Sequence, residues 1–172
     1  MVTKVRVALC GLTRGEPRLE HMQSRRAAIE AGIARLDILQ PGTPYLDVER
    51  NKLVRTFLTG LDEKGVRQFP EEYLCDFLLM LDDDIEFTPE DVTAVVDLAL
   101  KYHLDTGIMP VVSGCYRSTY EEQHITVAYT LGDIDSTDGK RQLHPITLEG
   151  TVESEIPIEI DAAGAGFLLT HR

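Results

Sequence analysis

A short apolar run that ends in three aspartates constrains this chain more than any other feature. The run Phe77–Leu81 is too short to cross a membrane and is apolar at every position, which is typical of a buried central strand. Asp82, Asp83 and Asp84 follow it directly. The segment Thr88–Asp91 then has an N-cap threonine, a proline at the first helical position and acids in the first turn, which predicts a helix start. A strand, an acidic turn and a helix in this order indicate an open α/β sheet.

The remaining elements are predicted from hydrophobic spacing and from the positions of glycine and proline. Strands are predicted at Val5–Leu12, Arg35–Leu39, Tyr73–Leu81, Met109–Ser113, Ile125–Leu131, Pro145–Leu148, Ile156–Ile160 and Phe167–Thr170. Helices are predicted at Glu20–Leu36, at Asp47–Leu61 and from Thr88 to about Tyr102, with a loop at Gly132–Gly139 and a turn at Ala162–Gly166. We therefore predict one domain, residues 1–172, with a mixed, mainly parallel α/β sheet flanked by helices.

The balance of charge limits the partners of the chain. Its formal net charge is −12, and such a surface repels phosphate backbones, so we expect no nucleic-acid partner. A nucleotide ligand is compatible with this negative charge, because a bound cation reverses the local field.

No apolar stretch approaches the roughly 20 residues that span a bilayer, and no secretory signal is visible, so we expect a cytoplasmic protein without a transmembrane segment. Cys10, Cys75 and Cys115 are far apart, which predicts reduced, buried thiols.

The acidic cluster itself has two interpretations. Ligands of open α/β sheets bind beyond the carboxyl ends of the strands, and three carboxylates crowded there are unfavourable without a cation. Their hard oxygens suit Mg²⁺ or Mn²⁺, which commonly bridge to substrate phosphates. Alternatively, the aspartates are solvated loop residues, or Asp84 and Glu86 complement the dipole of the next helix. A dinucleotide-binding G-x-G-x-x-G motif is not formed by Gly11 and Gly15.

Several segments, taken in order, resemble one known family. The segment Leu79–Ile85 is similar to an L-x-L-D-x-D-I metal motif, and Glu49–Val54 is similar to an A-R-N-x-L-V helix start. Val7–Thr13 resembles a first nucleotide-binding strand, while Val111–Arg117 and Asp161–Leu169 resemble V-V-x-G-x-Y and G-x-G-F-x-L segments. By these motifs the chain resembles the GT-A glycosyltransferases, especially the large inverting family 2, over most of its length.

The resemblance implies a GT-A-like, Rossmann-like fold that binds a nucleotide-diphospho-sugar and transfers the sugar to an acceptor hydroxyl. It implies Mn²⁺ or Mg²⁺ as cofactor, held by Asp82 and Asp84, with Asp82 facing the ribose or reaching the metal through water. The implied nucleotide-sugar-binding residues are Thr13, Arg50, Asp82, Asp83, Gly164 and Gly166. Arg50 has the alternative of a helix-surface ion pair with Asp47 or Glu49, and the glycines that of a tight turn entering a strand.

The catalytic residues stay unassigned. In the resembled family a general base follows the G-x-G-F-x-L strand, and here the sequence ends at Arg172, so we expect the C-terminal catalytic and acceptor part to be lacking. Two other functions remain open: a nucleotidyltransferase-like enzyme, and a non-catalytic binding or assembly module. The sugar, the nucleotide, the acceptor, the stereochemical course and the oligomeric state also stay open at this point.

Overall fold

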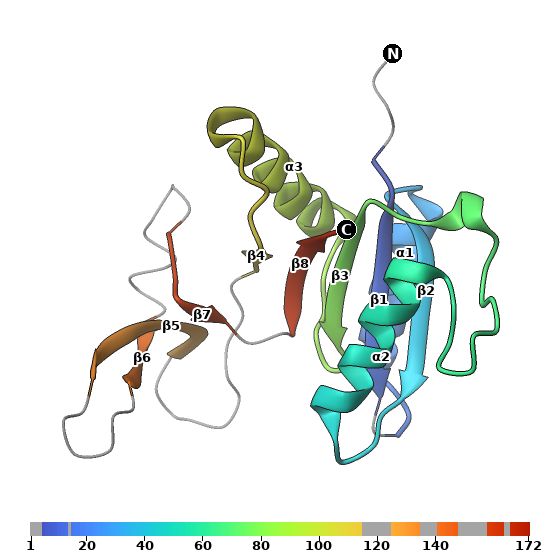
Figure 1. Cartoon of the computed structure of the whole chain (residues 1–172), viewed down its shortest axis with the longest axis horizontal. Coiled ribbons are helices and arrows are strands. Elements are labelled where there is room, and N and C mark those ends of the chain that lie inside the picture. The colour runs from blue at the N-terminus through green and yellow to red at the C-terminus, as the bar shows by residue number, and fades with distance from the viewer. Residues whose placement is uncertain (1–4, 14, 115–124, 135–140, 148–157, 164–165) are drawn as a thin grey trace. The chain divides into compact units, whose positions relative to one another are not determined.

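A computed structural model describes residues 5–13, 15–114, 125–134, 141–147, 158–163 and 166–172 (Figure 1). The chain divides into two compact units. The first contains Met1–Val112 and Gly166–Arg172, and the second contains Ser113–Ala165. No helix within the described ranges is long and apolar enough to cross a bilayer.

The first unit contains the helices and most of the strands. Its elements are β1 (Val7–Thr13), α1 (Leu19–Glu30), β2 (Ala34–Pro41), α2 (Leu46–Thr59), a 3₁₀ turn (Glu71–Tyr73), β3 (Phe77–Asp82), α3 (Pro89–Thr106) and β8 (Phe167–His171), and β4 (Val112–Ser113) straddles the boundary between the units. The five strands form one sheet in the order β2-β1-β3-β8-β4.

This sheet is mixed, and its parallel character is only partial. β1 runs parallel to both β2 and β3, with Leu12 opposite Asp82 at the end of the register. β8 is antiparallel to β3, with Leu81 opposite Phe167. The predicted α/β class with helices flanking a mixed sheet is confirmed, whereas the mainly parallel sheet is only partly right.

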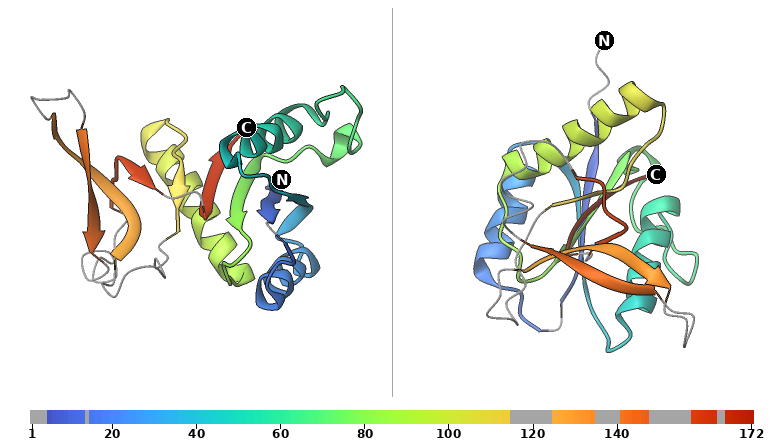
Figure 2. Two further views of the ribbon diagram at one scale, coloured as in Figure 1. Left: turned by 90° about the horizontal axis from the view of Figure 1, so that it is seen from below. Right: turned by 90° about the vertical axis from the view of Figure 1, so that its left-hand side faces the viewer.

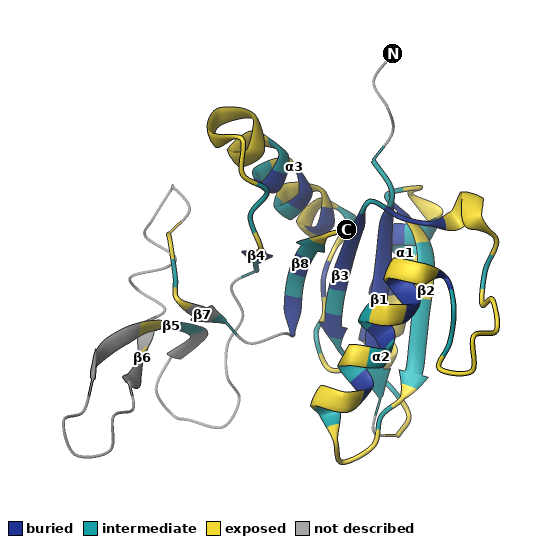
Figure 3. Ribbon diagram, viewed as in Figure 1, coloured by how far each residue is buried: buried dark blue, intermediate teal, exposed yellow. Residues whose placement is uncertain are grey.

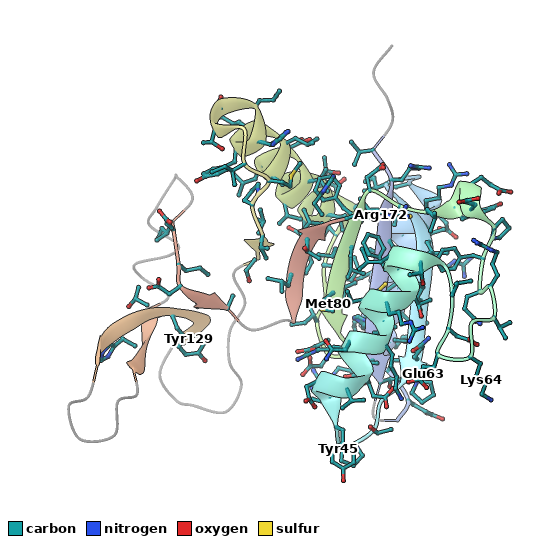
Figure 4. The ribbon with its side chains drawn as sticks, in the orientation of Figure 1. Tyr45, Glu63, Lys64, Met80, Tyr129 and Arg172 are labelled. Atoms are coloured by element: carbon teal, nitrogen blue, oxygen red, sulfur yellow. The ribbon has the colours of Figure 1, made fainter. Side chains whose placement is uncertain are left out.

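The helices cover both faces of the sheet (Figure 2). α2 lies on one face, and α1 with the first turns of α3 lies on the other. On the α2 face, the sheet residues Ala8, Cys10 and Leu78 form a buried cluster with Leu53 and Phe57 of the helix. Met80 packs against the same cluster (Figure 4). The strands at the centre of the sheet are buried while the outer side of α2 is exposed (Figure 3), as the apolar run of β3 predicts.

The ends of the helices agree with the sequence in two cases and differ in one. Thr88 and Asp91 form a capping box at the start of α3, and Gly60 ends α2 with a left-handed φ of 70°. α1 is shorter than the predicted Glu20–Leu36, because Gly32 has a positive φ of 70° and the chain then enters β2.

The second unit contains a three-stranded sheet in the order β6-β5-β7, formed by β5 (Ile125–Ile134), β6 (Arg141–Thr147) and β7 (Ala162–Ala163). β5 is antiparallel to both neighbours. The loop predicted at Gly132–Gly139 begins later than expected, because β5 continues to Ile134, and residues 135–140 lie outside the described ranges. Residues 158–160 are not a strand, and residues 156–157 lie outside the described ranges.

Two further expectations from the sequence can be compared with the structure. The strand predicted at Met109–Ser113 shortens to Val112–Ser113. Cys10 and Cys75 are free and buried, as predicted, and Cys115 lies outside the described residues.

The apolar core under α2 provides a test of which side chains stabilise the fold. Phe57→Ala should lower the free energy of unfolding by about 3–5 kcal/mol, because the side chain is only 2% exposed and its removal leaves a cavity. The next residue, Leu58, is 42% exposed, so Leu58→Ala should change stability by less than about 1 kcal/mol. Urea unfolding of both variants measures the difference, and equal losses would contradict the assigned helix face.

Candidate functional site at the carboxyl edge of the sheet

The parallel strands of the first unit end at one edge of the sheet. Thr13 ends β1 and Asp82 ends β3, one position apart in the register. The hydroxyl of Thr13 donates to the carbonyl of Gly15 at 2.7 Å and accepts from the amide of Gly15 at 3.3 Å. The carbonyl of Thr13 also accepts from the amide of Gly42, just after β2, at 2.7 Å. These bonds fix the backbone at the ends of β1 and β2 beside the acidic cluster.

The antiparallel strand β8 begins at the same edge. The amide of Asp82 donates to the carbonyl of Gly166 at 3.0 Å, so the residue that precedes β8 lies against the first aspartate. The structure thus brings Thr13, Asp82 and Gly166 to one edge. Gly164, which the sequence grouped with them, lies outside the described residues.

Arg50 of α2 reaches the acidic cluster from the side. Its Nη2 donates to Oδ1 of Asp82 at 2.8 Å, and the two side chains are 31% and 44% exposed. The alternative ion pair with Asp47 or Glu49 is therefore not formed, and Glu49 instead accepts from Lys52 at 3.0 Å. A partly exposed pair of this kind contributes at most about 1 kcal/mol to stability, so its main effect is to place a guanidinium beside the aspartates.

The three aspartates differ in exposure. Asp82 and Asp83 are half-buried, and Asp84 is exposed. The amide of Ile85 donates to the carbonyl of Asp82 at 3.3 Å, which closes a tight turn across Asp83 and Asp84. The turn thus presents the carboxylate of Asp84 to solvent while its backbone stays close to the end of β3.

One face of α1 is polar and buried, which the apolar pattern of the sequence does not predict. His21, Ser24 and Arg25 are 1%, 6% and 0% exposed, whereas the apolar Leu19 and Met22 of the same helix are 66% and 38% exposed. The one available signal was the spacing of the polar residues at i, i+3 and i+4, which places them on one helix face.

Arg25 is fully buried and hydrogen-bonded throughout. Its Nε donates to Oδ1 of Asp37 at 2.8 Å, and its Nη2 donates to the same oxygen. Nη2 also donates to the carbonyls of Leu9 at 3.2 Å and Ile38 at 3.1 Å. A buried guanidinium needs such a complete set, because an unpaired buried charge costs several kcal/mol.

The hydrogen bonds of His21 define its protonation state. Its Nδ1 is 2.7 Å from the carbonyl of Ile85, which can only accept, so Nδ1 carries the proton. Its Nε2 lies 3.4 Å from Nη1 of Arg25, which can only donate, so Nε2 is unprotonated. Burial lowers the pKa of His21 from 6.5, the hydrogen bond to Ile85 opposes this, and the Arg25 charge adds to the lowering against weaker contributions from Asp83 and Asp37. His21 is therefore a neutral ring in the folded protein.

The donor chemistry of the acidic turn suits a hard divalent cation bound together with a ligand. Within the described residues, no three histidine, cysteine, aspartate or glutamate side chains are grouped so as to hold a metal ion by themselves. Mg²⁺ is usually held by one or two carboxylates, with water and substrate phosphates completing its shell. The half-buried Asp82 and the exposed Asp84 fit that partial role, and Arg50 adds a donor that matches phosphate geometry.

Comparisons with known proteins give no family for this arrangement. No protein-family model matches the chain, and neither a curated protein nor a solved structure was found to match it. The function of the site is therefore inferred from its own geometry and chemistry.

Gly11 of β1 packs closely against β3 and against the guanidinium of Arg25. A Cβ at Gly11 would lie 2.8 Å from the carbonyl oxygen of Leu81 and 2.9 Å from Nη1 of Arg25. Gly11→Ala should therefore destabilise the fold by about 1–3 kcal/mol through overpacking. Gly15→Ala is the matched control, because no atom lies within 4 Å of its Cβ position. Thermal unfolding of both variants checks this, and an unchanged midpoint for Gly11→Ala would contradict the close packing.

The neutral state of His21 predicts a pH dependence of stability. Its pKa is lowered on folding, so the unfolded chain takes up a proton first as the pH falls through about 6.5, and the stabilising contribution of the neutral ring is then lost. His21→Asn should lose less stability between pH 7.5 and pH 5.5 than the wild type. Urea unfolding of the wild type and of His21→Asn across this range measures the slopes, and identical slopes for the two proteins would disprove the assignment.

Proposed function

We propose that the carboxyl edge of the first unit is the donor site of a metal-dependent glycosyltransferase, which binds a nucleotide-diphospho-sugar. The observation that carries the proposal is the meeting of Thr13, Arg50, Asp82 and Gly166 at one sheet edge, next to the exposed Asp84. Ligands of open α/β sheets bind beyond this edge. These residues come from four separate parts of the sequence, and the resemblance to GT-A enzymes assigns donor-binding roles to them.

The charges at the edge support a diphosphate bound with a cation. The aspartates alone repel a diphosphate, so its binding requires a cation between the two sets of oxygens. Asp84, with Asp82 as a direct or water-mediated ligand, would hold Mn²⁺ or Mg²⁺, and the bound ion would supply Lewis-acid stabilisation of the charge on the leaving diphosphate. Within the described residues, Arg50 forms an ion pair with Asp82 of the cluster, and its guanidinium can exchange this carboxylate for a phosphate oxygen.

The other residues shape the site for the nucleoside and the sugar. The hydroxyl of Thr13 is held at the end of β1 and lies toward the nucleoside end in this assignment. The backbone at Gly166 has no side chain to hinder a sugar that approaches the edge. The proposal concerns the donor half of the reaction: the acceptor hydroxyl must lose its proton to a general base, and none of these residues is assigned that role.

Metal-dependent nucleotide binding is the expected result of a calorimetric titration. UDP, GDP and their sugars should include at least one ligand that binds in the presence of Mn²⁺ and much more weakly in its absence. Asp84→Asn should weaken this binding by about 10-fold or more, because it removes a charged ligand of the cation.

The control is Asp97→Asn, which makes the same change of charge at an exposed residue of α3. It should bind as the wild type does. Binding that is equal with and without Mn²⁺, or equal losses in Asp84→Asn and Asp97→Asn, would contradict the metal-bridged donor site. The absence of any nucleotide binding would refute the proposed function.

A further inference from the structure

The acidic turn is attached to α1 along one side of that helix. The amide of Arg18, the N-cap of α1, donates to the carbonyl of Asp83 at 3.4 Å. Nδ1 of His21 donates to the carbonyl of Ile85 at 2.7 Å, and Oγ of Ser24 accepts from the amide of Phe87 at 3.0 Å. The N-cap Arg18 and the helix residues His21 and Ser24 are three positions apart from one another, while their partners in the turn are two positions apart. The helix therefore follows the backbone of the turn from the acidic cluster to the start of α3.

The side chains of α1 that make two of these attachments, His21 and Ser24, are shielded from water, whereas Arg18 is exposed. His21, Ser24 and Phe87 are 1%, 6% and 5% exposed. The ring of Phe87 packs edge-on against His21 at 6.2 Å between centroids and against Phe167 at 5.8 Å. A polar group that is withdrawn from water loses free energy when it loses its hydrogen-bond partner, so the bonds of His21 and Ser24 favour this one conformation of the turn.

Arg25 fixes the ring that makes the central bond. Its Nη1 faces Nε2 of His21 at 3.4 Å, so the ring keeps its proton on Nδ1, which points to Ile85. The guanidinium itself is bonded to β1 and β2 through Leu9 and Ile38. A continuous set of hydrogen bonds therefore runs from the sheet through α1 to the turn that contains Asp83 and Asp84.

We propose that His21 and Ser24 are positioning residues, which hold the acidic turn so that its carboxylates share a divalent cation with a nucleoside diphosphate. The functional part of this inference rests on the proposed donor site. Apolar residues of similar size would fill the space under the turn equally well, but they would leave the carbonyl of Ile85 and the amide of Phe87 without partners. The polar side chains of His21 and Ser24 therefore stabilise the conformation of the turn in addition to filling space in the core.

The test measures the turn and the ligand separately in the full chain. Ser24→Ala and His21→Leu should each speed the amide exchange of Phe87 and of its neighbours in the turn by about 10-fold or more, since one buried hydrogen bond is lost. With Mn²⁺ present, the affinity for UDP or GDP should fall by about 10-fold. His21→Asn, which keeps a donor near the position of Nδ1, should recover part of both losses.

Ala28→Gly is the matched control for loss of global stability. Ala28 is fully buried on the same helix, and its replacement weakens α1 without removing a bond to the turn. It should leave the exchange in the turn and the affinity close to wild type. If His21→Leu does not fold, Ser24→Ala against Ala28→Gly decides the question alone.

The outcomes separate the two proposals. Exchange in the turn that rises no more in Ser24→Ala than in Ala28→Gly would overturn the positioning role. Faster exchange with unchanged nucleotide affinity would also overturn it, because the turn would then be held for stability alone. If the wild type binds no nucleotide, the donor site is refuted, and the exchange data still decide whether α1 holds the turn.

Discussion

The buried guanidinium of Arg25 is the interaction on which the rest of the first unit depends. A charge withdrawn from water is tolerated only where its hydrogen bonds are complete and an opposite charge is close. β2 supplies the carboxylate of Asp37 and the carbonyl of Ile38, and β1 supplies the carbonyl of Leu9. These partners belong to neighbouring parallel strands, so the charge is satisfied only when α1, β1 and β2 are assembled together. Gly11 leaves the room that the guanidinium needs beside β1.

The same interaction connects the sheet to the acidic turn. On the α1 face, the hydrogen bond from His21 to Ile85 determines the geometry of the turn. Side chains alternate between the two faces of a strand, so Leu9 and Leu79 of the sheet lie on this same face, where they are fully buried. On the opposite face, Phe57 of α2 buries apolar surface against the sheet. A polar layer that fixes a turn is therefore compatible with a stable fold, because apolar side chains are buried on both faces of the sheet.

Helices and strands that are determined by a few neighbouring residues can be predicted from the sequence, whereas those that depend on distant residues cannot. The strand at Phe77 and the helix start at Thr88 depend on a few consecutive residues, and the sequence predicts both of them. The predicted helix is longer than α1 because Ile33, Ala34 and Leu36 continue a helical pattern, although Gly32 is left-handed and β2 begins at Ala34. The polar face of α1 was missed, since burial of such residues is decided by partners on other strands.

In the candidate site, one contact between distant residues is not predictable from local sequence, and the direction of one strand differs from the expected one. The parallel strands β1 and β3 bring Thr13 and Asp82 together, as the sequence implies. The ion pair of Arg50 with Asp82 joins residues 32 positions apart, so no local sequence pattern predicts it. The sheet was expected to be mainly parallel. Had β8 run parallel to β3, Gly166 would lie at the opposite edge, one strand length from the acidic cluster. Because β8 is antiparallel, its first residues lie against Asp82, so the departure from a parallel sheet is what completes the edge.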